Sequence, residues 1–440
     1  MVDPVTAPAA DDAADAPVET LTIVRLGARG DGIAEDGLPV PGALPGERVR
    51  VRRAGRIGAL VAVEEASPDR IAPFCPYYGA CGGCAVQHLA PAPYAEWKRG
   101  TVAQALAQAR VETELAPLLD AHGAGRRRIT LHVREIEGRA RAGLMAARSH
   151  ALVPIAHCPI TVPGLHRAPA VAEALAAPLG HGRKPLDVAA TATEAGLDLD
   201  IRGHGAVSEG VRGVLTRLAG ELDLARLSIH GDIVVERRPP LLGEGITRRG
   251  TPPGGFLQAT EAGEAALTAL VLEAMEGAKP RVKRAADLFC GSGPFALALA
   301  ARGIEVHAAE GDAASIIALT RAYRAAAGLS RITAETRDLF RRPLLGPELD
   351  ALDAVVFDPP RAGAEAQARR LAESRVPLVV GVACDPGTFA RDAAILIAGG
   401  YRLERVTPVD QFAWSSHVEL VGVFRKDPRK GAPRTLRRPR

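Results

Sequence analysis

The sequence predicts an α/β protein in which a Rossmann-like, doubly wound domain follows an OB-like N-terminal β-barrel and a central β-rich α+β domain. Three observations support this fold class. The C-terminal part alternates strand-like and helix-like segments, the pattern of a parallel sheet with crossover helices. The N-terminal part has short β-like runs between glycine- and proline-bearing turns. Between them, strand-like runs are broken by a helical piece near residues 169–177.

The composition is that of a multidomain globular protein. Its 440 residues are 47% hydrophobic and 24% charged, which is enough for two or three cores. No apolar run reaches the roughly 20 residues that a membrane helix requires. The first residues also lack the basic start and apolar core of a signal peptide. We therefore expect a cytoplasmic protein without membrane contact, and a monomer by default.

The patterns divide the chain into five predicted segments. Residues 1–17, rich in Ala, Asp and Pro, are predicted to be a disordered leader. The runs LTIVRL, ERVRVRRA and GALVAVEEA predict the barrel over residues 18–66. A cysteine-rich loop, the helical stretch YAEWKRGTVAQALAQA and the runs RITLHVRE, ARAGLMAA, GLDLDIRG and GDIVVERR predict the central domain over 67–250. The doubly wound domain takes residues 251–426, and a basic tail takes 427–440.

The charge is only mildly basic but unevenly distributed. The formal net charge is +4, yet three consecutive arginines stand at positions 126–128 and RKDPRKGAPRTLRRPR ends the chain. Such blocks favour contact with a polyanion, although the C-terminal run can equally be a solvated tail.

A glycine-bearing turn follows the first strand of the doubly wound domain. In DLFCGSGPF, residues 287–295, Gly291 and Gly293 let the backbone approach a ligand at the carboxyl edge of the sheet. Glu310 ends the next strand and is suited to bind ribose hydroxyls. The third glycine position of a dinucleotide fingerprint is Ala296, which that pattern tolerates, so spacing alone leaves a nicotinamide cofactor open.

A cysteine at a later strand end predicts nucleophilic chemistry. In GVACDPGTFARDA, Cys384 emerges at the carboxyl edge of the sheet, in the same crevice as the glycine turn. A thiolate there can attack C6 of uracil and turn C5, a poor nucleophile, into an enolate carbon that accepts a methyl group. The alternative is an inert buried cysteine.

Three cysteines crowd one loop of the central domain. PFCPYYGACGGCAVQH contains Cys75, Cys81 and Cys84, and Cys158 is the fourth candidate. Four thiolates suit tetrahedral zinc or a four-iron cluster, and soft ligands alone do not choose between them. The remaining Cys290, inside the glycine turn, is better interpreted as a packing residue.

Five motifs in order, FLQ, DLFCGSGPF, FDPPRAGA, CDPGTFARD and HVE, resemble the bacterial RNA uracil-5-methyltransferase family. FDPPR, residues 357–361, is similar to motif IV of nucleic-acid and amino-group methyltransferases. The barrel resembles a TRAM domain, and the cysteine loop resembles the iron–sulfur loop of a large subgroup. Together these motifs cover nearly the whole chain. The resemblance implies a Rossmann-like methyltransferase domain that uses S-adenosylmethionine, and a [4Fe–4S] cluster rather than zinc.

The resemblance also implies roles for single residues. Cys384 would be the nucleophile, and Glu419 of HVE would be the base that removes the C5 proton. The residues implied around S-adenosylmethionine are Gln258, Phe289, Gly291, Gly293, Glu310, Asp338 and Asp358. The implied cluster ligands are Cys75, Cys81, Cys84 and Cys158. Where many members carry asparagine, this chain has Pro294 and Asp385; the first weakens any side-chain contact from position 294.

The implied substrate is a uridine in structured RNA, extracted from its stack before reaction. The cluster-bearing branch of the family favours 23S rRNA, with transfer RNA as the alternative. Aromatic residues make up only 4% of the chain, and the candidates to stack on bases are Tyr77, Tyr78, Phe256, Phe412 and Trp414. Two other functions stay open: methylation of a base amino group without a cysteine nucleophile, and RNA binding by an iron–sulfur protein with a relic methyltransferase domain.

Overall fold

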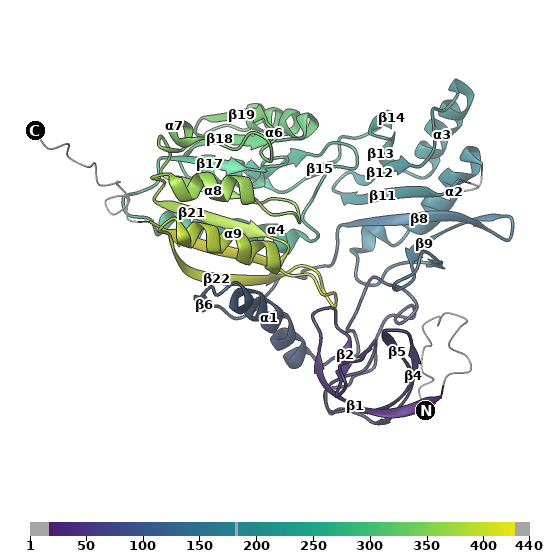
Figure 1. Ribbon diagram of the computed structural model, residues 1–440. Coiled ribbons are helices and arrows are strands. Elements are labelled where there is room, and N and C mark those ends of the chain that lie inside the picture. The colour runs from purple at the N-terminus through teal and green to yellow at the C-terminus, as the bar shows by residue number, and fades with distance from the viewer. Residues whose placement is uncertain (1–16, 181–183, 427–440) are drawn as a thin grey trace, which may run out of the picture. The chain divides into compact units, whose positions relative to one another are not determined.

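The computed structural model describes residues 17–180 and 184–426, so the predicted leader, apart from position 17, and the basic tail lie outside the described residues. The described chain forms two compact units (Figure 1). The first contains residues up to 100, 124–240 and 412–417, and the second contains 101–123, 241–411 and residues from 418 onward. The five-segment division of the chain stays a prediction.

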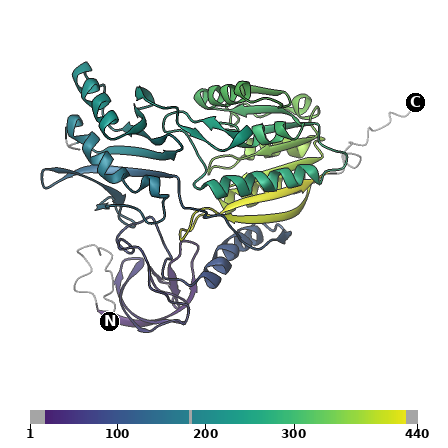
Figure 2. The same cartoon turned by 180° about the vertical axis from the view of Figure 1, so that it is seen from behind.

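The first unit begins with an antiparallel five-stranded sheet in the order β3-β2-β1-β4-β5. The strands are β1 (Val18–Leu26), β2 (Gly32–Ala34), β3 (Pro39–Val40), β4 (Arg48–Ala54) and β5 (Ile57–Glu65). In β4, arginines alternate with the fully buried Val49 and Val51. Because successive strand side chains point to opposite faces, this alternation sends the valines into the core. The curled sheet (Figure 2) confirms the N-terminal β domain of the predicted fold class.

A second sheet of seven strands, β10-β9-β8-β11-β12-β13-β14, completes the β-structure of the first unit. Its strands are β8 (Arg128–Ile136), β9 (Arg139–Met145), β10 (Leu152–Pro154), β11 (Leu186–Thr193), β12 (Gly196–Arg202), β13 (Leu224–Ile229) and β14 (Asp232–Glu236). The helices α2 (Ala168–Ala176) and α3 (Glu209–Glu221) share one apolar core with this sheet, and the short helices η2 (Pro163–Leu165) and η3 (Ala177–Leu179) flank α2. The sequence patterns missed β11, β13 and α3.

The second unit is built on a nine-stranded sheet in the order β19-β18-β17-β20-β21-β23-β22-β6, with β7 also paired to β22. Its strands are β6 (Glu114–Leu115), β7 (Leu119–Asp120), β17 (Arg284–Leu288), β18 (Glu305–Glu310), β19 (Ile332–Thr336), β20 (Ala354–Phe357), β21 (Leu378–Ala383), β22 (Arg402–Asp410) and β23 (Glu419–Arg425). The small elements β15 (Leu241–Leu242), η4 (Gly245–Thr247) and β16 (Arg249–Gly250) precede it.

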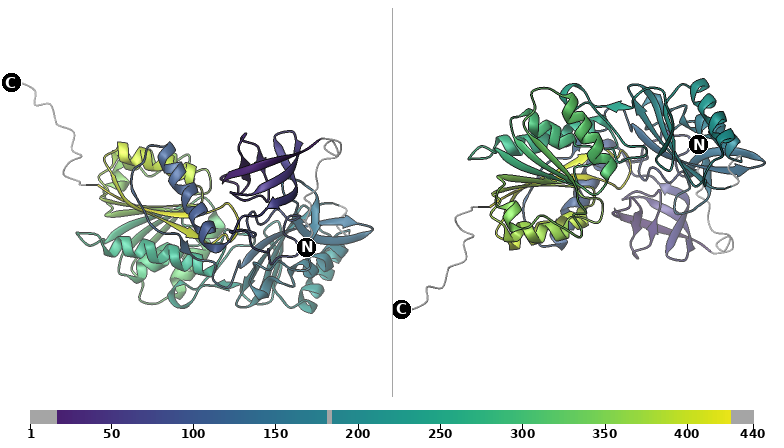
Figure 3. Two further views of the ribbon diagram at one scale, coloured as in Figure 1. Left: turned by 90° about the horizontal axis from the view of Figure 1, so that it is seen from below. Right: turned by 90° about the horizontal axis from the view of Figure 1, so that it is seen from above.

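Helices cover both faces of this sheet (Figure 3). The helices are α4 (Glu261–Glu276), α5 (Pro294–Ala301), α6 (Ala313–Ala325), α7 (Gly346–Leu349), α8 (Glu365–Glu373), α9 (Pro386–Ala398) and, from residue 101, the second half of α1 (Pro91–Gln108). Neighbouring residues of β20 face opposite cores: Val355 packs with α1, α8 and α9, and Val356 packs with α4, α5 and α6. This arrangement confirms the doubly wound domain.

The sheet differs from the expected parallel sheet at one end. Strands β19, β18, β17, β20 and β21 are parallel, but β23 runs antiparallel to both β21 and β22. The reason is the connection: a short loop joins β22 to β23, whereas a parallel pair requires a long crossover. None of the described helices has the length and apolar character needed to cross a membrane.

Candidate active site

The glycine turn between β17 and α5 is open on the side where a ligand would approach. Gly291 and Gly293 have φ angles of 52° and 84°. A Cβ added to Gly293 would lie 2.3 Å from Cδ1 of Leu319, whereas one added to Gly291 would meet no described atom within 4 Å. The Gly291 amide donates a hydrogen bond of 3.1 Å to Oε2 of Glu310, so the two predicted residues adjoin. Pro294 is the first residue of α5, where its missing N–H costs nothing.

A buried arginine fastens this turn to the segment that precedes α4. Arg249 is 2% exposed, and its Nε donates to Oγ of Ser292, between the two glycines, at 3.0 Å. Its Nη2 donates to Oε2 of Glu264 at 2.7 Å, and its Nη1 donates to the carbonyl of Thr247 at 3.2 Å. Arg249 was not predicted, because the sequence around it gives no sign that its side chain is buried.

An aromatic pair lies beside the turn. The rings of Phe289 and Phe340 are 5.4 Å apart between centroids, and Phe340 is 48% exposed. Phe340 was not predicted, although it stands two residues after Asp338. Asp338 accepts hydrogen bonds from the backbone of Phe340 and Arg341 at 3.0 and 3.3 Å. The described contacts of Asp338 therefore stabilise its own turn, and its implied cofactor contact stays a prediction.

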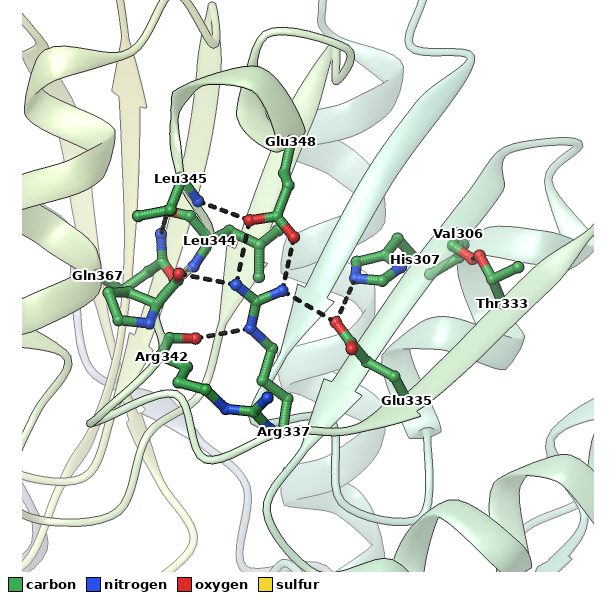
Figure 4. Close-up of polar contacts among 11 residues, drawn as sticks. Val306, His307, Thr333, Glu335, Arg337, Arg342, Leu344, Leu345, Glu348 and Gln367 are labelled. Carbon is green, nitrogen blue, oxygen red and sulfur yellow. Dashed lines mark hydrogen bonds and ion pairs between the residues drawn. The ribbon is translucent and has the colours of Figure 1, made fainter.

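Arg337 holds the segment after β19 in place (Figure 4). Its guanidinium donates to both carboxylate oxygens of Glu348, at 2.6 and 3.0 Å, and to the carbonyls of Arg342 and Pro343 at 2.6 and 2.9 Å. Its backbone amide donates to the carbonyl of Glu310 at 2.8 Å. The hydrogen bonds to Glu348 raise the pKa of Arg337. The side chain thus connects the Asp338 turn with the strand that ends in Glu310.

Three predicted residues converge at the carboxyl edge of the sheet because of strand register. Cys384 follows β21 and Glu419 begins β23, and these strands pair with Ala383 opposite Leu420. Asp358 follows β20, in which Phe357 pairs with Gly381 of β21. Cys384 and the two carboxyl groups are far apart in the sequence, and the register brings them to one edge of the second unit.

Two glutamines connect the carboxyl groups. Nε2 of Gln258 donates to Oδ2 of Asp358 at 3.0 Å, while its Oε1 accepts from Nε2 of Gln411 at 2.5 Å. Nε2 of Gln411 also donates to Oε1 of Glu419 at 3.1 Å. Gln411 is fully buried and was not predicted. The only sequence signal for it was a polar residue directly after a strand end.

Burial makes all three acidic groups hard to ionise. Burial raises the pKa of Asp358 to about 7, and burial together with the charge of Asp358 raises the pKa of Glu419 to about 8. Burial, then the charges of Glu419 and Asp358, raise the pKa of the Cys384 thiol to about 12, and Arg361 opposes this rise. Among the described residues, Oε2 of Glu419 has no hydrogen-bond partner. Such shifted groups at one edge are typical of catalytic sites.

A further buried carboxyl lies close to these groups. Asp287, at the end of β17, is fully buried, and this burial together with the charges of Asp358 and Glu310 raises its pKa well above the usual range. It opened the predicted turn motif but was not singled out as a site residue. A protonated Asp287 avoids placing another negative charge beside Asp358.

The residues that follow Cys384 have local structural roles. Asp385 caps α9, because its side chain accepts a hydrogen bond of 2.9 Å from the Thr388 amide. Aspartate can therefore cap the helix at the position where many members of the family that the sequence resembles carry asparagine. Asp392 accepts the Ala364 amide at 2.6 Å, and Arg391 donates to the carbonyl of Ala362 at 2.9 Å. The Arg391–Asp392 pair thereby holds the loop that follows Asp358.

The four predicted cluster cysteines lie in the first unit and interact with one another. Burial, with smaller contributions from Cys158 and Cys81, raises the pKa of Cys84 to about 12. The pKa of Cys158 is raised by burial, then by Cys81 and Cys75. Within the described ranges, however, no three His, Cys, Asp or Glu side chains are arranged to hold a metal ion. The donor chemistry fits an iron–sulfur cluster, but the described side chains do not form a ligand shell.

The five aromatic candidates for base stacking differ in exposure. Phe256 is 67% exposed in the second unit. In the first unit, Trp414 packs edge-on against Phe74 at 4.9 Å, and the guanidinium of Arg126 lies 5.6 Å from the Phe412 ring centroid. The hydroxyls of Tyr77 and Tyr78 form hydrogen bonds with Ala156 and with Ala85 and His88. The tyrosines are therefore already part of the packing of the cysteine loop.

Comparison with known proteins identifies relatives along nearly the whole chain. Residues 254–427 match the family model for tRNA (uracil-5-)-methyltransferase. An RNA methyltransferase of Brucella suis is 47% identical over 92% of this chain and 97% of its own length. A 23S rRNA (uracil(1939)-C(5))-methyltransferase of Chromohalobacter salexigens is 34% identical over 96% of this chain and 93% of its own length. In fold, the chain is similar to a Pyrococcus abyssi tRNA (uracil-54, C5)-methyltransferase, with a TM-score of 0.71, 22% identity and coverage of 92% and 99% of the two chains.

Proposed function

The chain belongs to the RNA uracil-5-methyltransferase family, and we propose that it methylates C5 of one uridine in structured RNA through a covalent bond between Cys384 and C6. The observation that carries this proposal is the convergence of Cys384, Glu419 and Asp358 at one edge of the sheet. The glycine turn that follows β17 lies at the same edge. A mere structural cysteine does not require two buried carboxyl groups beside it.

The proposed reaction proceeds in three steps. The Cys384 thiolate adds to C6, and the electron pair of the C5–C6 double bond moves toward C5 and O4. When bound, S-adenosylmethionine would supply the methyl group from its electrophilic sulfonium: the new bond forms at C5, the S–CH3 bond breaks, and S-adenosylhomocysteine is the leaving group. Glu419 then takes the proton from C5, the C5–C6 double bond forms again, and the bond to Cys384 breaks to release the thiolate. The proton on Glu419 passes to solvent before the next cycle.

The cofactor residues fit this reaction. An added Cβ on Gly291 would enter open space, and backbone without side chains is what a closely held nucleoside requires. We assign Glu310 to the ribose hydroxyls of S-adenosylmethionine and Phe289 and Asp338 to its adenine base. Gln258 and Asp358 are assigned to the end of the cofactor that carries the methyl group. The Gln258–Asp358 hydrogen bond supports the last assignment, because it places both side chains at the edge that holds Cys384.

We propose 23S rRNA as the substrate. The support is the 34% identity to a protein named for 23S rRNA over nearly the full length of both chains. A transfer RNA substrate is the alternative. From an RNA substrate we infer a cytoplasmic enzyme, with a monomer as the default assembly. Mass-spectrometric mapping of 5-methyluridine in RNA from cells with and without the gene will identify the modified RNA.

We also propose a [4Fe–4S] cluster on Cys75, Cys81, Cys84 and Cys158, with a structural role. The thiols' nearness to one another supports it: Cys158 and Cys81 help to raise the pKa of Cys84, and Cys81 and Cys75 help to raise the pKa of Cys158. Protein purified without oxygen should contain about four irons and four sulfides per chain. Cys84→Ala and Cys158→Ala should lose them, while Cys290→Ala serves as the control. Zinc in place of iron would contradict this proposal.

RNA containing 5-fluorouridine tests the covalent mechanism. Fluorine at C5 cannot leave as a cation, so the adduct should persist once the methyl group has been transferred. We expect a covalent enzyme–RNA complex that is stable in denaturant and maps to Cys384, and none with Cys384→Ala. Methylation that survives in Cys384→Ala would instead support the alternative of an amino-group methyltransferase.

A further inference from the structure

A buried lysine joins the two ends of the loop that connects β22 to β23. Lys98, on α1, is 1% exposed. Its Nζ donates to the carbonyl oxygen of Phe412 at 2.9 Å and to that of His417 at 2.6 Å, and lies 5.4 Å from the centroid of the Tyr94 ring. Phe412 and His417 are the first and last residues of the loop segment that packs in the first unit.

The middle of the same loop is held by backbone contacts within that unit. The carbonyl of Trp414 accepts the amides of Ala85 and Val86 at 2.7 and 3.1 Å. Its own amide donates to the hydroxyl of Tyr94 at 2.9 Å, and its φ angle is 55°. Since a non-glycine residue in this conformation is strained, these bonds select one shape of the loop.

The loop ends are directly connected to two residues of the proposed active site. Gln411 precedes Phe412, and Glu419 follows His417 by two positions. Gln411 and Glu419 share a hydrogen bond of 3.1 Å, and both belong to the second unit. The Lys98 ammonium group bonds both ends of the loop. It therefore fixes the distance between the end of β22 and the start of β23.

We propose that Lys98 is a positioning residue for Glu419, and this inference rests on the proposed function. By holding both ends of the loop, Lys98 keeps Gln411 and Glu419 in the geometry in which the carboxylate reaches the C5 proton. The two hydrogen bonds that Lys98 donates go to loop carbonyls and to no reacting atom. Its loss affects deprotonation, the last chemical step, and leaves the glycine turn and Cys384 in place.

This role predicts a signature that simple destabilisation does not produce. In Lys98→Met, Cys384 still attacks and the methyl group is still transferred, but the C5 proton is removed slowly. A methylated covalent complex should then accumulate with ordinary uridine RNA. We expect kcat to fall about 100-fold, the effect of misplacing a catalytic group by about 1 Å. The dissociation constant for S-adenosylhomocysteine should remain unchanged.

Lys426 provides a matched control in the second unit. Its Nζ donates to the carbonyls of Ala372 and Ser374 at 2.8 and 2.9 Å and lies 5.0 Å from the Tyr401 ring centroid. It therefore has the same kind of contacts as Lys98, but its two hydrogen bonds go to carbonyls outside the loop. Lys426→Met should accumulate no covalent complex. Tyr94→Phe, which removes only the hydroxyl that accepts the Trp414 amide, provides a milder second variant of the loop should Lys98→Met fail to fold.

Glu419→Gln separates failure of this inference from failure of the proposed function. If Glu419→Gln accumulates the covalent complex while Lys98→Met and Tyr94→Phe turn over like the wild type, the positioning role is wrong. If neither Glu419→Gln nor 5-fluorouridine RNA traps a complex, the proposed mechanism itself is wrong. Accumulation in Lys98→Met and Glu419→Gln, but not in Lys426→Met, is the expected result.

Discussion

Cys384 and Glu419 face each other across two antiparallel strands, because Ala383 pairs with Leu420 in the register of β21 and β23. The carboxyl group therefore influences the ionisation of the thiol. The charge of Glu419 raises the pKa of Cys384, and burial raises the pKa of Glu419 itself. In the free enzyme, both groups are held mainly in their neutral forms near neutral pH.

Removing the neighbouring carboxylates should activate the thiol. In Glu419→Gln and Asp358→Asn, a negative charge beside Cys384 is lost, so the pKa of the thiol falls and its thiolate fraction rises. We expect faster alkylation of Cys384 by iodoacetamide at pH 8, measured by peptide mass spectrometry. Asp353→Asn is the control, because Asp353 binds backbone amides just before β17, at the opposite edge of the sheet. Slower alkylation in either active-site variant would contradict the proposed geometry.

Adduct formation should depend steeply on pH. Because burial and the two carboxyl groups raise the pKa of Cys384 to about 12, the thiolate is scarce at neutral pH and becomes more abundant as the pH rises. Glu419 must also be ionised to accept a proton, and its pKa is raised as well. Ionisation of both groups increases as the pH rises, so the rate of single-turnover methylation should increase from pH 6 to pH 9. If the rate of methylation in a stopped-flow assay had its maximum near pH 6, a thiolate that forms only at high pH would be excluded.

The two glycines of the turn should respond differently to alanine. Both variants introduce a side chain at positive φ, which costs about 1–2 kcal/mol. Gly293→Ala also forces a Cβ to 2.3 Å from Leu319, so it should destabilise the second unit more. Gly291→Ala places its methyl group in open space and should mainly weaken binding of S-adenosylhomocysteine, measured by calorimetry.

Gly328→Ala provides the matched control for backbone strain. Gly328 has a φ angle of 77°, and an added Cβ there would meet no described atom within 4 Å. It lies in the connection between α6 and β19, away from the turn. Equal losses of affinity in Gly291→Ala and Gly328→Ala would mean that the open space at Gly291 does not hold the ligand.

The sequence predicted those parts of the site that strand ends and local motifs specify. Cys384, Asp358 and Glu310 each follow or end a strand whose apolar run is visible in the sequence, so their common edge could be foreseen from topology. Gln411 and Arg249 could not be foreseen, because their importance comes from burial and from partners more than 40 residues away in the chain. The antiparallel β22–β23 hairpin was missed for a related reason: residues 412–417, which connect its strands, pack with residues near position 85 in the first unit.

Arg249 should support both the stability of the second unit and cofactor binding. Arg249→Met removes the guanidinium that pairs with the buried carboxyl group of Glu264, so it should lower the free energy of unfolding by about 3–5 kcal/mol. Hydrogen exchange, which reports on each unit separately, measures this loss. The double variant Arg249→Met, Glu264→Met should lose less than the sum of the single variants, because it leaves no unpaired charge behind.

The Arg226–Asp198 pair separates the cofactor effect of Arg249 from a general loss of stability. This pair is also buried, with both side chains 5% exposed, and it lies in the first unit. Arg226→Met should therefore destabilise the protein without changing the affinity for S-adenosylhomocysteine. Arg249→Met should weaken that affinity, because Ser292 loses the bond that fixes it between the two glycines. If both arginine variants bind S-adenosylhomocysteine equally well, the hydrogen bond to Ser292 does not shape the turn for its ligand.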